Sequence, residues 1–354
     1  MTRRTIATLL AGTLTGVLMI AAFWLPVPYV HIEPGGTVDL LSEEGGRERI
    51  EVSGAKAHHD DGELHMTTII ATPPETDIRL AEALSAWVSP DEAVQPYDNV
   101  YDERTTEEED AERAKVQMSS SRDAAIAAAL RQLGREVPES WAVSEITRGA
   151  PADGSLALGD RIVAVGGEPT PEWTDVVEAI QAEEPGRPLA LRVLREGKRL
   201  TTTLRPVERE GKAFVGITSG LIYDFPVDVK IHISENIGGP SAGMMFALAI
   251  VDTMTPGPIT GGERVAGTGT IDGDGNVGGI GGIQQKVVTA REAGVGLFLA
   301  PASNCNEVVA APADGLRVVP VATLEEAEQA VTTYADDPDA DLPTCDDVLE
   351  EAGR

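Results

Sequence analysis

The sequence predicts an α+β multidomain protein that begins with a transmembrane helix, and three patterns support this prediction. An uncharged and mostly apolar run of 20 residues covers positions 6–25. Short apolar segments and turn residues over 138–206 are typical of a small β-rich domain. Residues 227–251 change from strand-like alternation to a continuous apolar helix across a glycine-rich turn. The predicted order is a cytoplasmic N-terminus with its anchor (1–30), an α/β N-terminal region (31–137), the β-rich domain (138–206), an α/β domain (207–335) and an acidic C-terminal tail (336–354).

The apolar run Ile6–Leu25 is long enough to cross a bilayer, because ~20 residues at ~1.5 Å each span the ~30 Å hydrocarbon core. A cleaved signal peptide is the alternative. The end of the run offers no small-x-small cleavage site, and Trp24 and Tyr29 suit an interfacial belt, which favours a retained anchor. Arg3 and Arg4 precede the run, so we expect a single-pass membrane protein with its N-terminus in the cytoplasm and its other domains outside.

The charge balance excludes one class of partner. The chain has 28 Lys and Arg residues against 58 Asp and Glu residues, a net charge of −30. Such a surface repels the phosphate backbone of nucleic acids and the headgroups of anionic lipids. We therefore predict no nucleic-acid partner, and we expect the body of the protein to be held off the membrane surface.

The N-terminal region, 31–137, combines short strand-like runs with predicted helices over 80–87 and 118–133. Its cluster His58–Asp61, with His65 nearby, contains side chains that bind metals. No further ligand pair lies at a fixed spacing, so a polar turn is the favoured interpretation and no metal site is predicted.

Residues 138–206 show a recognisable order of elements. Two strand-like segments flank a Gly-Ala-Pro-Ala turn, a helix with Pro171 in its first turn follows, and a hairpin covers 189–204. This order resembles a PDZ domain, a β-sandwich with helices, of the type that accompanies bacterial proteases. The resemblance implies that an extended polypeptide binds beside an exposed strand edge. A purely structural role with an occluded groove is the alternative.

Ser241 lies where a predicted strand, Val227–Ile233, delivers the chain through a glycine-rich turn to an apolar helix. Unpaired backbone N–H groups and the positive end of the helix dipole meet at such a point, which favours a developing oxyanion. For Gly-Pro-Ser alone, a simple helix N-cap would be the preferred interpretation.

A second motif lies 45 residues further along the chain. Lys286 follows Gly281-Gly282 and falls near the start of a predicted helix that ends at Gly294. A solvated surface lysine is the alternative. Together, Gly-Pro-Ser-Ala-Gly at 239–243, Thr268-Gly269 and Gly-Gly-x-x-x-Lys resemble, in order and spacing, the α/β proteolytic domain of Lon-type serine proteases over about 207–335.

The resemblance implies that Ser241 is a nucleophile, that Lys286 is its general base, and that the hydroxyl of Thr268 orients the lysine. Thr270 departs from the family, whose ATP-dependent members usually carry a glutamate in Thr-Gly-Glu, and we expect this to change the wall of the site rather than the dyad. The backbone expected around the oxyanion belongs to Gly239, Pro240 and Ala242.

The chemistry requires an unusual lysine. A serine hydroxyl is a poor nucleophile unless a base removes its proton, and lysine is a base near neutral pH only if burial lowers its pKa from about 10.4. Apolar residues around the motifs would supply that burial: Ile271, Val277, Ile280, Ile283 and Val287. No histidine lies in a matching motif, and His232 falls on the polar face of its strand, as a solvated or lining residue.

Two motifs in the same region are interpreted as a hairpin turn. Gly273–Gly278 fits G-x-G-x-x-G, but no strand-to-helix unit brackets it, so we predict no dinucleotide site. Asp272–Asn276 begins like a calcium loop but has Val277 and Ile283 where a glycine and a glutamate are needed. We therefore expect no cofactor. A G-x-x-x-x-G-K-[ST] segment is also absent from the sequence, so no ATP-driven unfolding is encoded in it.

Cys305 and Cys345 are the two cysteines, and in an extracytoplasmic chain they are compatible with one disulfide, with two buried thiols as the alternative. The order of anchor, PDZ-like and Lon-like domains resembles the membrane-anchored PDZ–Lon-like proteases of Gram-positive bacteria. We therefore predict an ATP-independent serine endopeptidase that cleaves flexible or unfolded polypeptides outside the membrane. A non-catalytic PDZ scaffold of the cell envelope is the alternative, a small-ligand-binding protein has no supporting site, and an oligomer is possible but not specified.

Overall fold

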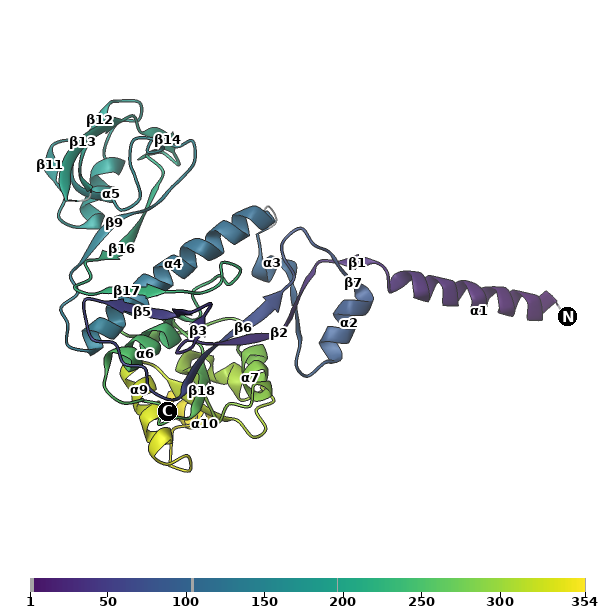
Figure 1. Cartoon of the computed structure of the whole chain (residues 1–354). Coiled ribbons are helices and arrows are strands. Elements are labelled where there is room, and N and C mark those ends of the chain that lie inside the picture. The colour runs from purple at the N-terminus through teal and green to yellow at the C-terminus, as the bar shows by residue number, and fades with distance from the viewer. Residues whose placement is uncertain (1–2, 103–104, 196, 354) are drawn as a thin grey trace. The chain divides into compact units, whose positions relative to one another are not determined.

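The computed structural model describes residues 3–102, 105–195 and 197–353 and is drawn in Figure 1. The chain forms two compact units. The first unit combines Met1–Arg135 with Val227–Arg354, and the second consists of Glu136–Pro226.

These units group the chain differently from the expected domains. Strands from the 31–137 region pair with strands of the C-terminal half in one sheet, so that region belongs to the same unit as the Lon-like segment. Residues 207–226 lie in the second unit, because β16 (Ile217–Tyr223) pairs with β9 (Glu139–Ile146) over its whole length.

The predicted membrane anchor is wrong. Helix α1 (Arg3–Ala22) has 20 residues, yet among the residues that the structure describes no helix combines the length and the apolar character needed to span a bilayer. The helix ends at Ala22, so the predicted apolar run over 6–25 is not helical to its end, which includes Phe23, Trp24 and Leu25. The predicted membrane location, with a cytoplasmic N-terminus and extracytoplasmic domains, is corrected with it.

The first unit is built around a six-stranded mixed sheet with the order β22-β21-β18-β6-β2-β8. Strands β6, β18, β21 and β22 are parallel, whereas β2 is antiparallel to both β6 and β8. The two halves of the chain meet where Leu64 pairs with Val265 and Met66 pairs with Gly267. The strands are β2 (Tyr29–Asp39), β6 (Glu63–Ala71), β8 (Ala93–Pro96), β18 (Arg264–Gly267), β21 (Leu297–Pro301) and β22 (Arg317–Val321).

Short two-stranded pairs surround this sheet. They are β1 (Pro26–Val27) with β7 (Ile78–Arg79), β3 (Glu43–Glu44) with β4 (Arg47–Glu48), β5 (Ile50–Ser53) with β17 (Asp228–Ile231), and β19 (Thr270–Ile271) with β20 (Val277–Gly278).

Burial on all sides explains the apolar character of two elements beside the site. Helix α6 is buried from Gly243 to Thr253, and every residue of β21 is buried, as in parallel sheets that are covered on both faces. The α-helices of this unit are α1 with α2 (Leu80–Val88), α3 (Tyr97–Val100), α4 (Glu107–Gln132), α6 (Gly243–Met254), α7 (Ile283–Glu292), α8 (Cys305–Val308), α9 (Leu324–Asp336) and α10 (Cys345–Ala352), and a 3₁₀ turn covers Ala302–Asn304.

Capping boxes begin two helical stretches that the sequence analysis did not predict, the first part of α4 and helix α10 in the C-terminal tail. Helix α4 begins at Glu107 rather than near 118, because the Thr106 side chain accepts the Glu109 N–H while Glu109 reaches back to the Thr106 N–H. In the acidic tail, Thr344 and Asp347 cap α10 in the same way. Cys305 and Cys345 form a disulfide with an S–S distance of 2.17 Å, which joins the start of α8 to the start of α10.

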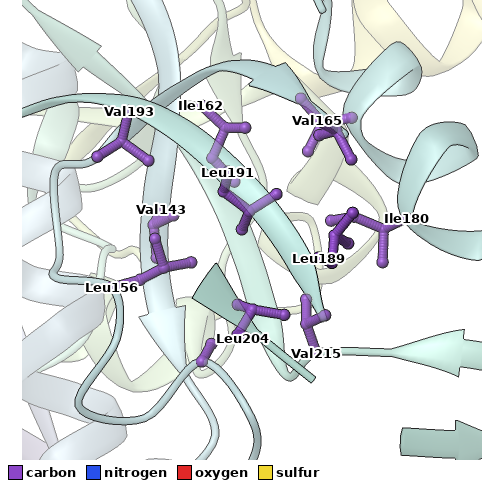
Figure 2. Packing of buried hydrophobic residues seen from close by; sticks show 12 residues of the cluster. Val143, Leu156, Ile162, Val165, Ile180, Leu189, Leu191, Val193, Leu204 and Val215 are labelled. Carbon is purple, nitrogen blue, oxygen red and sulfur yellow. The ribbon is translucent and has the colours of Figure 1, made fainter. Parts of the chain in front are cut away.

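The second unit contains the β-rich domain. Its four-stranded sheet has the order β11-β10-β12-β13, and helix α5 (Trp173–Gln181) buries Val176 and Ile180 in the same hydrophobic cluster as the strands (Figure 2). The strands are β9 and β16 with β10 (Arg161–Val165), β11 (Glu168–Pro169), β12 (Leu189–Arg195), β13 (Lys198–Leu204), β14 (Val207–Arg209) and β15 (Lys212–Phe214). Inside this unit, the buried Asp160 carboxylate accepts two hydrogen bonds of 2.7 Å from Arg195.

Candidate active site

The loop before Ser241 is held against helix α4 by close contacts. A Cβ on Gly238 would lie 2.6 Å from the Cβ of Ala114, so only glycine fits, and Gly239 adopts φ +86°. The Gly239 N–H donates to the Ala114 carbonyl at 3.0 Å. The Ser121 hydroxyl donates to the Pro240 carbonyl at 3.0 Å. These contacts place Ser241, which is partly buried, just before helix α6.

Lys286 lies in the first turn of α7 and points its amine at this serine. Its Nζ is 2.7 Å from Ser241 Oγ and 2.9 Å from Thr268 Oγ1. Only 2 % of Lys286 and 1 % of Thr268 are exposed to solvent. The structure therefore brings together the three side chains that the sequence motifs selected.

Hydrogen-bond directions at Thr268 define how the lysine is oriented. The Thr268 hydroxyl donates to the Ser241 carbonyl at 2.9 Å, and a carbonyl can only accept. The threonine oxygen must therefore accept a hydrogen from Lys286. In the neutral amine this leaves the nitrogen lone pair free to accept the hydroxyl proton of Ser241. The Gly269 N–H donates to the same Ser241 carbonyl at 2.8 Å, which fixes the serine backbone from a second direction.

Burial tunes the basicity of the lysine. It lowers the pKa of Lys286 from 10.5 to about 8, because the charged ammonium loses its hydration in the protein interior. In the part of the chain that the structure describes, no carboxylate forms an ion pair with Lys286 to oppose this effect. Its neighbours on α7, Ile283 and Val287, are fully buried. A large fraction of the lysine is therefore neutral near pH 8.

The backbone groups expected around the oxyanion differ in what they can donate. Pro240 has no N–H, and the Gly239 N–H is bound to Ala114. Among the described residues, the Ala242 N–H makes no backbone or side-chain hydrogen bond. Of the three, Ala242 is thus the donor that a developing oxyanion can use.

A groove of about 510 Å³ opens onto Ser241, and sequence reasoning did not assign the wall of the groove that strand β6 forms. The groove is lined by the loop 236–242, by Lys286, and by Met66–Ile70 of strand β6. Strand β18 pairs with β6 only as far as Met66, so the next residues of β6 run on past the end of β18 along the groove. Local sequence carries no signal for this, because the pairing joins segments about 200 residues apart.

The other sequence motifs lie away from the dyad. His232 Nε2 is 2.9 Å from a Glu51 carboxylate oxygen. Asp272 accepts the N–H groups of Asp274 and Asn276 inside the hairpin between β19 and β20. Within the residues that the structure describes, no group of three or more His, Cys, Asp or Glu side chains is placed to hold a metal ion, and His59 instead lies 3.2 Å from Glu48.

Comparisons with known proteins define the class of this chain. Residues 209–333 match the family model of the Lon protease (S16) C-terminal proteolytic domain, and residues 115–205 match the PDZ domain model. The chain therefore carries a Lon-type serine peptidase domain together with a PDZ domain. The PDZ match begins inside α4 of the first unit and ends before β14.

Named relatives agree with this class over one segment. The chain is 36% identical over 106 residues to the Lon protease of Neorickettsia sennetsu. The matched segment covers 28% of this chain and 13% of the relative. The chain is 39% identical over 77 residues to the Lon protease of Clostridioides difficile, covering 21% and 10%. This chain thus spans only a small part of the length of these relatives. A solved PDZ domain of the SdrC-like protein from Listeria monocytogenes is 18% identical, with a TM-score of 0.21, over 23% of this chain and 86% of that one.

Proposed function

We propose that this chain is an ATP-independent serine endopeptidase that cleaves flexible or unfolded polypeptides with a Ser241–Lys286 dyad. The observation that carries the proposal is the 2.7 Å contact between Ser241 Oγ and a lysine amine whose pKa burial lowers to about 8. The absence of a phosphate-binding G-x-x-x-x-G-K-[ST] segment from these 354 residues supports independence from ATP.

The proposed reaction follows from the arrangement of donors and acceptors. Neutral Lys286 accepts the hydroxyl proton as Ser241 Oγ attacks the carbonyl carbon of the scissile peptide bond. The oxyanion that forms is stabilised by the Ala242 N–H and the start of α6. The lysine then donates its proton to the leaving amine, which breaks the C–N bond and leaves an acyl-enzyme. A water molecule, deprotonated by the same lysine, hydrolyses the ester and restores Ser241.

Thr268 acts on the lysine rather than on the substrate in this scheme. It accepts one N–H of Lys286 and anchors itself on the Ser241 carbonyl, so the lone pair stays directed at Ser241 Oγ. The neighbouring groove lets an extended substrate lie along β6. Backbone hydrogen bonds between β6 and the substrate bind its main chain and do not depend on a particular side chain. This suits unfolded substrates of varied sequence, and the PDZ domain is proposed to supply a second site for polypeptide partners.

The scaffold alternative makes no use of the buried lysine. An ammonium group without a counter-ion costs folding free energy, and a non-catalytic protein gains nothing from it. The test is cleavage of fluorescein-labelled casein without ATP, together with labelling by a fluorophosphonate probe. We expect wild type to cleave and to be labelled at Ser241, and Ser241→Ala to do neither while keeping its melting temperature. Equal activity of the two proteins would refute the proposal.

A further inference from the structure

A second cavity, of about 720 Å³, adjoins the groove at the nucleophile. Met118 and Ile237 line both spaces, so the two lie side by side. Helix α4 forms one wall and contributes Lys115, Met118 and Arg122, which share one face at spacings of three and four residues. We call this space the basic cavity, because three cationic side chains line it: Arg47, Lys115 and Arg122.

The basic cavity contrasts with the rest of this acidic chain. Its lining also includes two carboxylates, but Glu44 is already 3.0 Å from Arg49, which leaves Glu235 as the other acidic group. Lys115 forms an exposed ion pair of 3.2 Å with Glu112. His232, also in the lining, is bound to Glu51 outside it.

Arg122 has no hydrogen-bond or ion-pair partner among the residues that the structure describes. Its Nε is buried and has no hydrogen-bond acceptor, and no carboxylate forms an ion pair with it among the residues that the structure describes. Arginine stays charged in proteins, and a half-buried guanidinium without an acceptor costs free energy that a bound anion would offset. Asp123, its neighbour in sequence, supplies a nearby negative charge but no hydrogen bond.

We propose that Arg122 determines specificity by binding an acidic side chain of the polypeptide substrate in the basic cavity. The inference rests on the proposed peptidase function and names the substrate class of the same site. Ile237 lines both spaces and precedes Ser241 by four positions, so the basic cavity lies no more than a few residue lengths from Ser241. An extended substrate, at ~3.3 Å per residue, therefore reaches the cavity with a side chain a few residues from the scissile bond. A carboxylate there accepts hydrogen bonds from the guanidinium with two charged oxygens, whereas an amide offers one neutral oxygen and a cationic side chain offers no acceptor.

The test uses the shortest casein-derived peptide that wild type cleaves, in internally quenched form. Glutamate or glutamine is placed in turn at two to six residues on either side of the cleaved bond. We expect one position at which glutamate raises kcat/KM about tenfold over glutamine, through KM. Arg122→Gln should remove that preference by slowing cleavage of the glutamate peptide about tenfold, the size of a charged hydrogen bond, while cleavage of the glutamine peptide falls much less. The matched control is Arg113→Gln, an exposed residue of α4 outside the cavity, which should keep the preference.

Two further measurements keep the outcome decisive. Lys115→Gln, at an exposed position in the same lining, serves if Arg122→Gln melts early, and it should weaken the preference in the same direction. Fluorescence anisotropy of the labelled peptides on Ser241→Ala reads the charge preference without turnover, so a failure of the peptidase proposal is distinguishable from a failure of this one. The inference is overturned if wild type shows no preference for glutamate, or if Arg122→Gln weakens both peptides equally.

Discussion

Replacing Lys286 with methionine should stabilise the fold at neutral pH while it abolishes the proposed activity. Lys286 is 2 % exposed, and burial lowers its pKa from 10.5 to about 8. This difference corresponds to about 3 kcal/mol by which the protonated lysine destabilises the folded state. Methionine removes that penalty but loses the hydrogen bonds to Ser241 and Thr268, at about 1 kcal/mol each. The expected net gain is about 1 kcal/mol.

The gain has a defined dependence on pH. Below pH 8 the lysine is protonated in both states, so the full penalty acts on the wild type. Between about 8 and 10.5 the unfolded chain binds more protons than the folded one, and the free energy of unfolding of the wild type therefore rises with pH. The advantage of Lys286→Met should shrink from pH 8 by about 1.4 kcal/mol per pH unit and change sign near pH 9, and above about pH 10.5 only the cost of the lost hydrogen bonds should remain.

Urea unfolding followed by circular dichroism at pH 7 and pH 10 measures this difference. Lys230→Met is the matched control, because Lys230 is half exposed on β17 and should give the same offset from wild type at both pH values. A Lys286→Met protein that is less stable than wild type at pH 7, or whose offset does not change with pH, would show that Lys286 is not buried as a costly cation.

Three further predictions concern the dyad, the disulfide and the packing behind the nucleophile. Activity should rise with pH along one limb with a midpoint at about 8, as Lys286 loses its proton; His232→Gln should keep that limb, and Lys286→Arg should be inactive because guanidinium retains its proton. Control of the limb by His232 in a rate profile would mean that the base is misassigned. Serine at both Cys305 and Cys345, which are 40 residues apart, should lower the free energy of unfolding by roughly 3–4 kcal/mol, and a thiol assay on unreduced, denatured wild type should find none. Gly243→Ala would bring a Cβ within 2.8 Å of Ser121 Oγ, so it should reduce activity and melting temperature, and adding Ser121→Ala should restore part of both.

Much of the candidate site could be selected from sequence because its signals are local. The turn before Ser241 and the helix carrying Lys286 follow from glycine placement and apolar periodicity, whereas the resemblance to Lon-type proteases singled out these two residues and added Thr268. The structure places Lys286 Nζ within 2.9 Å of both hydroxyls, while the catalytic roles of these residues stay predictions. Ser121, which holds the Pro240 carbonyl, gave no signal, because a serine inside a helix does not reveal its distant partner.

The parts that sequence did not predict depend on long-range pairing. Nothing local in β6 specifies that it lies beside β18, so the N-terminal region was expected to stand apart from the Lon-like domain. The pairing of β16 with β9 likewise moves 217–223 into the PDZ-containing unit. The error at α1 is different in kind: the predicted span was read from an uncharged run that continues to Leu25, whereas the helix ends at Ala22.

The pairing of β6 with β18 has a consequence for the order in which the chain folds during synthesis. Strand β6 cannot pair with β18 until the ribosome has synthesised about 200 more residues. The unit Glu136–Pro226, in contrast, contains all of its own strands as soon as it has been synthesised. At about 5–20 residues per second, that delay is on the order of ten seconds or more. Thr268 and Lys286 emerge after the same wait, so no nascent chain can hold an assembled dyad before nearly all of it has been made. Lys286 therefore reaches Ser241 only late in synthesis, and the proposed activity is expected to appear no earlier.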